Sequence, residues 1–302
     1  MRDLNELASY CKNYDCVMLK DEPLKNHTTF RIGGCCNALI VISNVKALQK
    51  LVVFCNENKI PWMVLGNGSN VLVSDSGYDG VIFQLGKSFS KIQMQSETLI
   101  SCESGALLSA AGHFALDKSL TGMECLSGIP GTIGGALYMN AGAYGSDMSN
   151  VVVSAEFIDE SGNIKTITKE EMELGYRKSI FSGTRCIITK IILKLEKGKY
   201  SDIKDEMDSL MRQRRAKQPL ELPSAGSTFK RPVGNYASFL IDQCGLKGAS
   251  VGDAQVSTKH AGFVVNTGHA TCANVLELCD FVIETVKEKT GYELELEPII
   301  IK

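Results

Sequence analysis

The chain has 302 residues, 44% of them hydrophobic and 22% charged, and its formal net charge is −2 at pH 7. These values are typical of a globular protein long enough for about two domains. The near balance of charges excludes a general basic surface for nucleic acid or anionic lipid. The sequence has no apolar run of about eighteen residues and no secretory signal at its N-terminus. We therefore expect a cytoplasmic protein without nucleic-acid or membrane partners.

The cysteines and histidines give no sign of a metal site. Eleven cysteines and four histidines are scattered along the chain, with no C-x-x-C pair. Structural zinc sites need ligands two to about four residues apart. The cysteines lie in apolar stretches, so we expect reduced, buried thiols and no bound metal.

The first 200 residues predict an α+β pattern. After an amphipathic lead-in over 1–20, apolar residues recur at helical spacing over 44–59, and 105–118 is rich in alanine and leucine. Short apolar runs predict strands at 62–66, 70–74, 80–86, 91–95, 98–104, 151–159, 162–168 and 185–198.

The remaining third of the chain is more helical. Charged amphipathic helices are expected over 202–217 and 274–289, the second capped by Thr271 or Asn274 and ended by Gly291. The final YELELEPIII alternates as a strand would, which places Glu293, Glu295 and Glu297 on one face. The change in character predicts domains at 1–197, with subdomains of about 1–64 and 65–197, and at 198–302.

Two glycine-rich segments are candidates for ligand binding. GNGSN (66–70) lacks the third glycine and the following helix of a dinucleotide fingerprint. It is either a nest of N–H groups for a diphosphate or a plain hairpin turn. GIPGTIGGALYMNAGAYG (128–145) contains no charged residue, so its backbone can approach another group closely. Together the two segments favour a large, flat, phosphate-bearing ligand.

Three segments each carry one reactive side chain. They are Arg177 in YRKSIF, Ser227 in PSAGSTFKRP, and Glu297 before Pro298 near the chain end. Taken singly, these would be a surface arginine, a turn serine and a solvated glutamate. The sequence contains no G-x-S-x-G elbow, so a hydrolase triad is not indicated.

In combination these motifs resemble the UDP-N-acetylenolpyruvoylglucosamine reductase (MurB) family. The similarity also includes NHTTFRIGG (26–34), QVSTKHAGFVVN (255–266) and GYELELE (291–297), in the family's order. The resemblance implies an FAD-binding domain of the vanillyl-alcohol-oxidase type, made of two α/β subdomains, and a smaller α+β substrate domain. It implies non-covalent FAD, NADPH as reductant, and reduction of UDP-N-acetylglucosamine enolpyruvate to UDP-N-acetylmuramate. The short spacing between Ser227 and Lys259 is similar to the type II form, and we expect a monomer.

The resemblance also assigns roles to individual residues. Ser227 corresponds to the family's proton donor, and Arg177 and Glu297 to the pair beside the substrate carboxylate. Substrate contacts are expected at Tyr176, Arg214, Lys217 and Lys230. Cofactor contacts are expected at Thr29, Arg31, Gly33, Gly66, Asn67, Gly68, Ser69, Asn70, Gly128, Ile129, Gly131, Thr132, Gly134, Gly135, Asn140, Gly142 and Ala143.

Alternatives remain open at two levels. Aligning the chain end on LEP would place Ile299, instead of Glu297, at the catalytic position, and Phe239 stands where the family commonly has lysine. The competing functions are another flavin-dependent oxidase of the same fold and a non-catalytic electron-transfer module. The set of serine, arginine and glutamate favours the reductase, because an electron carrier needs none of them.

Overall fold

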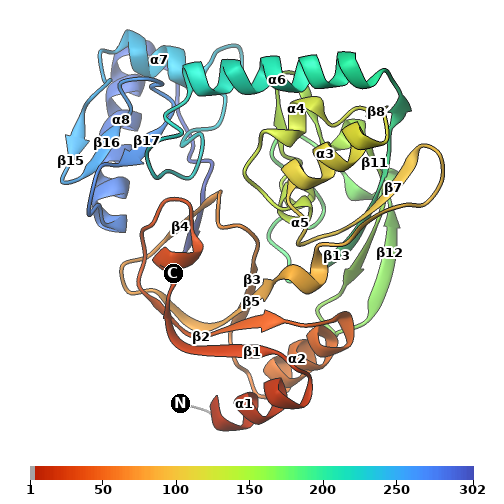
Figure 1. Cartoon of the computed structure of the whole chain (residues 1–302). Coiled ribbons are helices and arrows are strands. Elements are labelled where there is room, and N and C mark those ends of the chain that lie inside the picture. Colours follow the sequence, from red (N-terminus) through yellow and green to blue (C-terminus); the bar gives the residue numbers. More distant parts are fainter. Residues whose placement is uncertain (1–3) are drawn as a thin grey trace. The chain divides into compact units, whose positions relative to one another are not determined.

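The computed structural model describes residues 4–302, which form two compact units (Figure 1). Unit 1 comprises the described residues up to Lys20, Ala38–Asn67 and Gly80–Arg212. Unit 2 comprises Asp21–Asn37, Gly68–Asp79 and Gln213–Lys302. Each unit is thus built from several separate segments of the chain. The predicted domains, 1–197 and 198–302, are continuous ranges, and they stay a prediction.

The first layer of unit 1 contains helices α1 (Leu4–Asn13) and α2 (Val45–Glu57) and most residues of a four-stranded sheet. The strand order is β1 (Val17–Pro23), β2 (Cys35–Ile42), β5 (Tyr78–Leu85), β3 (Trp62–Leu65). The predicted helix at 44–59 is confirmed, and the Asn44 side chain caps it by accepting from the Ala47 N–H at 2.9 Å. The apolar spacing that predicted α2 also buries it, because Leu48 and Leu51 are fully inaccessible.

The second layer of unit 1 is an antiparallel sheet covered by short helices. Its strand order is β12 (Ile164–Thr168), β11 (Val152–Ile158), β13 (Ile187–Lys194), β7 (Leu99–Glu103), β6 (Ile92–Met94). Helices α3 (Leu108–Asp117), α4 (Glu124–Ser127) and α5 (Ile133–Tyr138) lie together beside this sheet in Figure 1 and share one apolar core with it. The strands that glycine-bounded apolar runs predicted in this region are therefore confirmed.

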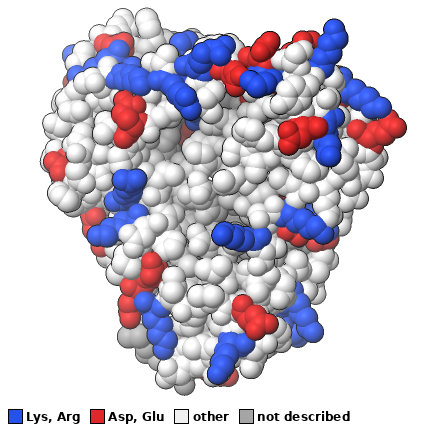
Figure 2. Space-filling model, viewed as in Figure 1, with Lys and Arg blue, Asp and Glu red and all other residues white. Residues whose placement is uncertain are grey.

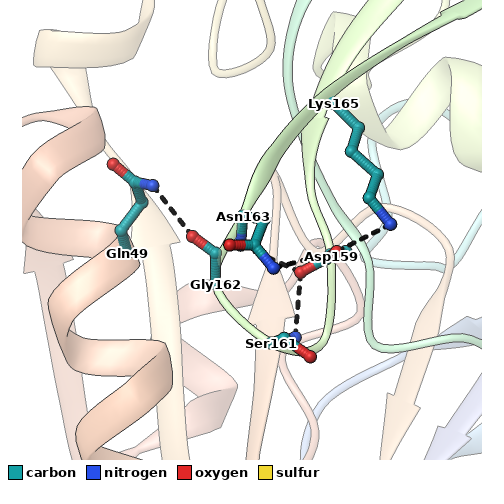
Figure 3. Close-up of polar contacts among 6 residues, drawn as sticks. All are labelled: Gln49, Asp159, Ser161, Gly162, Asn163 and Lys165. Carbon is teal, nitrogen blue, oxygen red and sulfur yellow. Dashed lines mark hydrogen bonds and ion pairs between the residues drawn. The ribbon is translucent and has the colours of Figure 1, made fainter.

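A tight turn joins the two layers of unit 1 (Figure 3). Asp159 accepts the backbone N–H groups of Ser161 and Asn163, both at 2.9 Å, and pairs with Lys165 at 2.9 Å. The hydrogen bond from Lys165 is the largest effect that lowers the pKa of Asp159, to about 2. On the α2 side, the Gln49 side-chain amide donates to the Gly162 carbonyl at 2.8 Å. This contact, and the apolar core that Ile158 and Ile187 share with α2, link residues of both predicted subdomains within one unit.

Unit 2 packs two helices on a small sheet. The sheet order is β15 (Ser250–Val251), β16 (Ala254–Val256), β17 (Val264–Asn266), and the helices are α7 (Ala237–Gln243) and α8 (Cys272–Thr290). The predicted signals at both ends of α8 are confirmed: Thr271 and Asn274 form a capping box, and Gly291 follows with φ of 76°. Separately, β4 (Val71–Val73) pairs in parallel with β18 (Ile299–Ile301).

The remaining elements are short or connect the units. Helix α6 (Tyr200–Lys217) confirms the predicted charged helix, and Ile203 is its one buried residue. The others are β8 (Leu120–Thr121), β9 (Gly142–Ala143), β10 (Ser146–Asp147), β14 (Glu196–Lys197) and the 3₁₀ turns η1 (Leu24–His27), η2 (Lys87–Phe89), η3 (Met148–Asn150) and η4 (Glu170–Met172).

The predicted strand over the terminal YELELEPIII is wrong for most of its length. Before Pro298 the run makes a single bridge, Leu296 to Phe229, and regular pairing begins only at Ile299. Pro298 has no N–H to donate to a ladder, which interrupts pairing at that point. The alternation itself is present, since Leu294 is buried while Glu293 and Glu295 are exposed.

The chemistry of the surface and thiols agrees with a globular protein. Figure 2 shows positive and negative side chains interspersed over the visible face. The cysteines are free thiols, mostly buried, and Cys35 is exposed. In residues 4–302, no cluster of histidine, cysteine and carboxylate side chains could hold a metal ion. Within the same range, no helix has the length and apolar character needed to span a membrane.

Candidate flavin and catalytic sites

The candidate residues divide between the two units. Unit 1 holds Gly66, Asn67, Gly128, Ile129, Gly131, Thr132, Gly134, Gly135, Asn140, Gly142, Ala143, Tyr176 and Arg177. Unit 2 holds Thr29, Arg31, Gly33, Gly68, Ser69, Asn70, Arg214, Lys217, Ser227, Lys230 and Glu297.

In unit 1 the two glycine-rich segments contact each other. The Asn67 side chain donates to the Pro130 carbonyl at 2.7 Å. A Cβ on Gly66 would lie 2.7 Å from Thr132 Oγ1, so glycine is required for this approach. The same Thr132 hydroxyl oxygen caps α5 by accepting from the Gly135 N–H at 3.2 Å. The two segments predicted to line one ligand are therefore in direct contact at Gly66–Asn67 and Pro130–Thr132.

Part of the close approach predicted for residues 128–145 is to the protein itself. Gly134 donates its N–H to the Ser104 carbonyl at 2.8 Å, and a Cβ there would lie 2.6 Å from Ser104 Cβ. Glycine at this position therefore serves packing of α5 on the sheet. Its role toward a cofactor stays a prediction.

Arg177 lies at the tip of a two-residue hairpin in unit 1. Gly175 and Lys178 exchange backbone hydrogen bonds of 3.0 and 3.2 Å, which close the turn. Arg177 has φ of 53°, a left-handed conformation that costs a non-glycine residue about 1 kcal/mol. Its guanidinium lies 5.1 Å from the Tyr176 ring centre, and Nη2 donates to the Gly142 carbonyl at 3.4 Å. A strained backbone that aims a cation is typical of a functional turn.

In unit 2, Ser227 and Glu297 lie on paired backbone segments. Phe229 bridges Leu296 in antiparallel register, and Glu297 donates its N–H to the Thr228 carbonyl at 2.9 Å. Ser227 is next to Thr228, so the two predicted catalytic residues are held near each other by the backbone. Asn70 fixes the same segment, because its side chain donates to the Glu297 carbonyl at 3.4 Å and its carbonyl accepts from Ile299 at 2.9 Å.

Thr228 is a supporting residue that sequence reasoning missed. It is 2% exposed, its N–H donates to the Gly262 carbonyl at 2.8 Å, and its hydroxyl accepts from the Val264 N–H at 2.8 Å. These bonds fix the backbone beside Ser227. The only signal in the sequence was a threonine next to the candidate serine.

His260 lies close in sequence to Gly262, whose carbonyl accepts from the Thr228 N–H. Burial is the largest effect that lowers the pKa of His260, so its ring favours the neutral form.

The loop GNGSN is not a plain hairpin turn. Its flanking strands belong to different sheets, since β3 pairs with β5 and β4 pairs with β18. Gly68 has φ of 62°, and a Cβ there would lie 2.1 Å from the His27 carbonyl oxygen. Thr29 packs against this loop by donating its N–H to the Gly68 carbonyl at 3.1 Å. The loop therefore has a conformation and a neighbour that exclude any side chain at position 68.

A basic pocket lies beside this loop in unit 2. It has a volume of about 410 Å³ and is lined by Lys25, Asn26, Thr28 and Arg31. Thr28 is 8% exposed, and its hydroxyl oxygen has no hydrogen-bond partner in the described part of the chain. A buried hydroxyl without a partner is costly unless a ligand or water satisfies it. Sequence reasoning selected Thr29 and Arg31 but could not tell which of two adjacent threonines faces the pocket.

The predicted substrate contacts occupy two kinds of position. Arg214 and Lys217 lie in the last turn of α6, and Lys230 pairs with Glu295 at 3.0 Å. Tyr176 is 54% exposed at the Arg177 hairpin. Their contacts with substrate stay predictions.

Comparisons with known proteins identify first the class of protein. Residues 36–168 match the FAD binding domain family, and residues 218–301 match the C-terminal domain of UDP-N-acetylenolpyruvoylglucosamine reductase. Alkyldihydroxyacetonephosphate synthase aligns at 14% identity with a TM-score of 0.50, over 65% of this chain and 41% of that chain, a likeness of fold alone. The chain is an FAD-dependent oxidoreductase, and the predicted α+β fold of the vanillyl-alcohol-oxidase type is confirmed.

The particular family follows from full-length relatives. The UDP-N-acetylenolpyruvoylglucosamine reductases of Caldanaerobacter subterraneus and Clostridium perfringens are each 47% identical over 93% of this chain and 92% of their own. The crystal structure of MurB from Thermus caldophilus has a TM-score of 0.81 at 34% identity, covering 95% of this chain and 99% of that chain. The chain belongs to the UDP-N-acetylenolpyruvoylglucosamine reductase (MurB) family, as its motifs predicted.

The residues present fit the phosphate-bearing part of FAD. The unit 2 pocket is lined by two cations, Lys25 and Arg31, which is the chemistry a diphosphate needs. Lys25 and Arg31 would hold anionic oxygens there. Gly68, held in a left-handed conformation, lets the adjacent loop offer backbone N–H groups.

Proposed function

We propose that the protein reduces UDP-N-acetylglucosamine enolpyruvate to UDP-N-acetylmuramate, a peptidoglycan precursor, with NADPH as reductant. The observation that carries the proposal is the pairing of the Ser227 and Glu297 segments in a chain 47% identical to named reductases over 93% of its length. We also propose that the reaction takes place in the cytoplasm and that the protein acts as a monomer.

Arg177 is proposed to bind the substrate carboxylate. Hydride addition to the enolpyruvyl double bond pushes negative charge toward that carboxylate. A guanidinium whose position is already fixed stabilises this charge without reorganising during the reaction. The closed hairpin and the left-handed φ of 53° at Arg177 support such a fixed position.

Ser227 is proposed to donate the proton that completes the reduction. FAD, when bound, supplies the hydride. The Ser227 hydroxyl would deliver a proton to the carbon adjacent to the one reduced, and the substrate carboxylate recovers its charge distribution. Thr228 supports this role because its three hydrogen bonds restrict the backbone that carries the serine. Glu297 is proposed to orient the same substrate group from the paired segment.

The remaining substrate contacts are proposed from charge. Arg214, Lys217 and Lys230 would bind the diphosphate of the UDP-sugar, and the exposed Tyr176 ring would pack beside the sugar. None of these side chains is needed by a flavoprotein that only passes electrons to a partner.

The test separates the two halves of the reaction under anaerobic conditions. NADPH should bleach the flavin absorbance, and UDP-N-acetylglucosamine enolpyruvate should restore it. Ser227→Ala should leave bleaching within about twofold of wild type and slow the recovery by at least about 100-fold, the size of a lost general acid. Bleaching without recovery in the wild type would refute the substrate, and equal loss of both halves in Ser227→Ala would refute the proton-donor role.

A further inference from the structure

The Arg177 hairpin is fixed by hydrogen bonds to one short segment, residues 138–142. Asn140 is 2% exposed and donates its side-chain N–H to the Gly175 carbonyl at 3.0 Å, directly before the hairpin tip. Ser179 is 1% exposed and donates its hydroxyl to the Tyr138 carbonyl at 2.5 Å, directly after the tip. The two flanks of the tip are therefore tied to the same segment.

The Asn140 amide is held in one orientation, with its N–H toward the Gly175 carbonyl. Its side-chain oxygen accepts from the Ser149 N–H at 3.0 Å, so both ends of the amide are engaged within unit 1. Its φ is 45°, a left-handed conformation that asparagine tolerates better than most residues. Buried side chains with both polar ends satisfied are rigid, and a rigid amide transmits its position to its partner.

We infer that Asn140 is a positioning residue for Arg177, acting through the Gly175 carbonyl. Without the amide, the hairpin keeps its own two backbone bonds and the Ser179 bond to Tyr138, but the flank before the tip is no longer tied to the 138–142 segment. The Arg177 head, which also returns to this segment through Gly142, would then occupy a wider range of positions. This inference rests on the proposed role of Arg177 and gives the buried amide of the glycine-rich segment a function other than contact with the cofactor.

The primary test is Asn140→Gly. Glycine adopts φ of 45° without strain, and the Ser149 N–H keeps its second acceptor, Asp147 Oδ1, at 3.0 Å. Relative to the rate at which NADPH reduces the flavin of the same variant, reoxidation by the enolpyruvyl substrate should slow by about 10- to 100-fold, as expected for a displaced catalytic group. Asn150→Ala is the matched control, because it removes a side-chain amide from the same region. The Asn150 side-chain oxygen accepts from the Asp147 N–H at 3.0 Å and from the Ser146 hydroxyl at 3.5 Å, neither of which belongs to the Arg177 hairpin.

Two further readouts separate positioning from a general structural effect. In an Arg177→Ala background, Asn140→Gly should cause no additional slowing of reoxidation, since its effect acts through Arg177. Hydrogen exchange in the peptide that contains residues 175–178 should be faster in Asn140→Gly than in wild type, and unchanged in Asn150→Ala. Asn140→Asp, which keeps an acceptor for Ser149 but loses the donor to Gly175, should reproduce both effects.

The outcomes distinguish this inference from the proposed function. If Arg177→Ala has no effect on reoxidation, the proposed role of Arg177 is wrong. If Arg177→Ala abolishes reoxidation while Asn140→Gly and Asn140→Asp leave it unchanged, Asn140 does not position Arg177. Additive effects of Asn140→Gly and Arg177→Ala, or unchanged exchange at 175–178, would also overturn the inference.

Discussion

The buried thiol of Cys102 should make the protein less stable in mild alkali. Cys102 lies on β7, is fully inaccessible, and is paired with Ile191 and Ile92 on the neighbouring strands. Burial raises the pKa of this thiol from 9.0 to about 12. Between these two values the unfolded chain loses the thiol proton and the folded chain keeps it, so the free energy of unfolding falls as pH rises.

The size of the effect follows from the two pKa values. Each pH unit above 9 lowers the free energy of unfolding by up to about 1.4 kcal/mol for one such thiol. Between pH 8 and pH 10, the wild type should therefore lose about 1.4 kcal/mol more than Cys102→Ala. Other buried thiols, such as Cys279 in unit 2, add to the loss in both proteins and cancel in this difference.

The assay is urea denaturation of the FAD-saturated protein at pH 8 and pH 10 with a thiol-free reductant. The single tryptophan, Trp62, is 3% exposed in unit 1, so its fluorescence reports the unit that contains Cys102. Ile100→Val, on the same strand, is the control: it should lower stability by about 0.5–1.5 kcal/mol equally at both pH values. An equal pH dependence in wild type and Cys102→Ala would refute the reasoning.

Two further predictions concern the backbone. Gly68→Ala should reduce the ratio of flavin to purified protein, because its Cβ would lie 2.1 Å from the His27 carbonyl oxygen, whereas Gly145→Ala, with φ of 85° but nothing within 4 Å, should keep the flavin and cost only about 1 kcal/mol of strain. Equal flavin content in the two variants would contradict this. Thr271→Ala should lower the free energy of unfolding by about 1 kcal/mol through loss of the α8 cap, measured by denaturation followed by circular dichroism, and Thr271→Ser should retain most of it. A loss of similar size in the serine variant would show that the hydroxyl is not the stabilising group.

Local signals in the sequence predicted most of the secondary structure. The caps of α8 and the apolar spacing of α2 were sufficient because both depend on neighbours within a few residues. The terminal strand failed because pairing depends on a partner far along the chain, and Pro298 interrupts the ladder that alternation alone suggests.

The candidate site could be predicted only in part, because it too depends on contacts between residues far apart in the sequence. Ser227 and Glu297 could be named from motifs, but the Phe229–Leu296 bridge and the Thr228–Glu297 hydrogen bond that pair their segments join residues about seventy positions apart. The environments of Thr28 and Asn140 could not be predicted, because a buried hydroxyl without a partner in the described part of the chain and an amide engaged at both ends are properties of packing. Glycine likewise signalled close approach in the sequence without saying whether the neighbour is a ligand or, as at Gly134, the protein.

The interleaving of the two units determines how the chain can be made. Strand β4 (Val71–Val73) is synthesised well before its partner β18 (Ile299–Ile301), so the pair cannot form until the residues of β18 have been made. Contacts between such distant residues form slowly, and an N-terminal fragment presents an unpaired strand edge in the meantime. A gene fragment ending near residue 212 should therefore yield incomplete, aggregation-prone material. Co-expression with residues 213–302 should recover it, because the missing segment supplies the partner strand in trans.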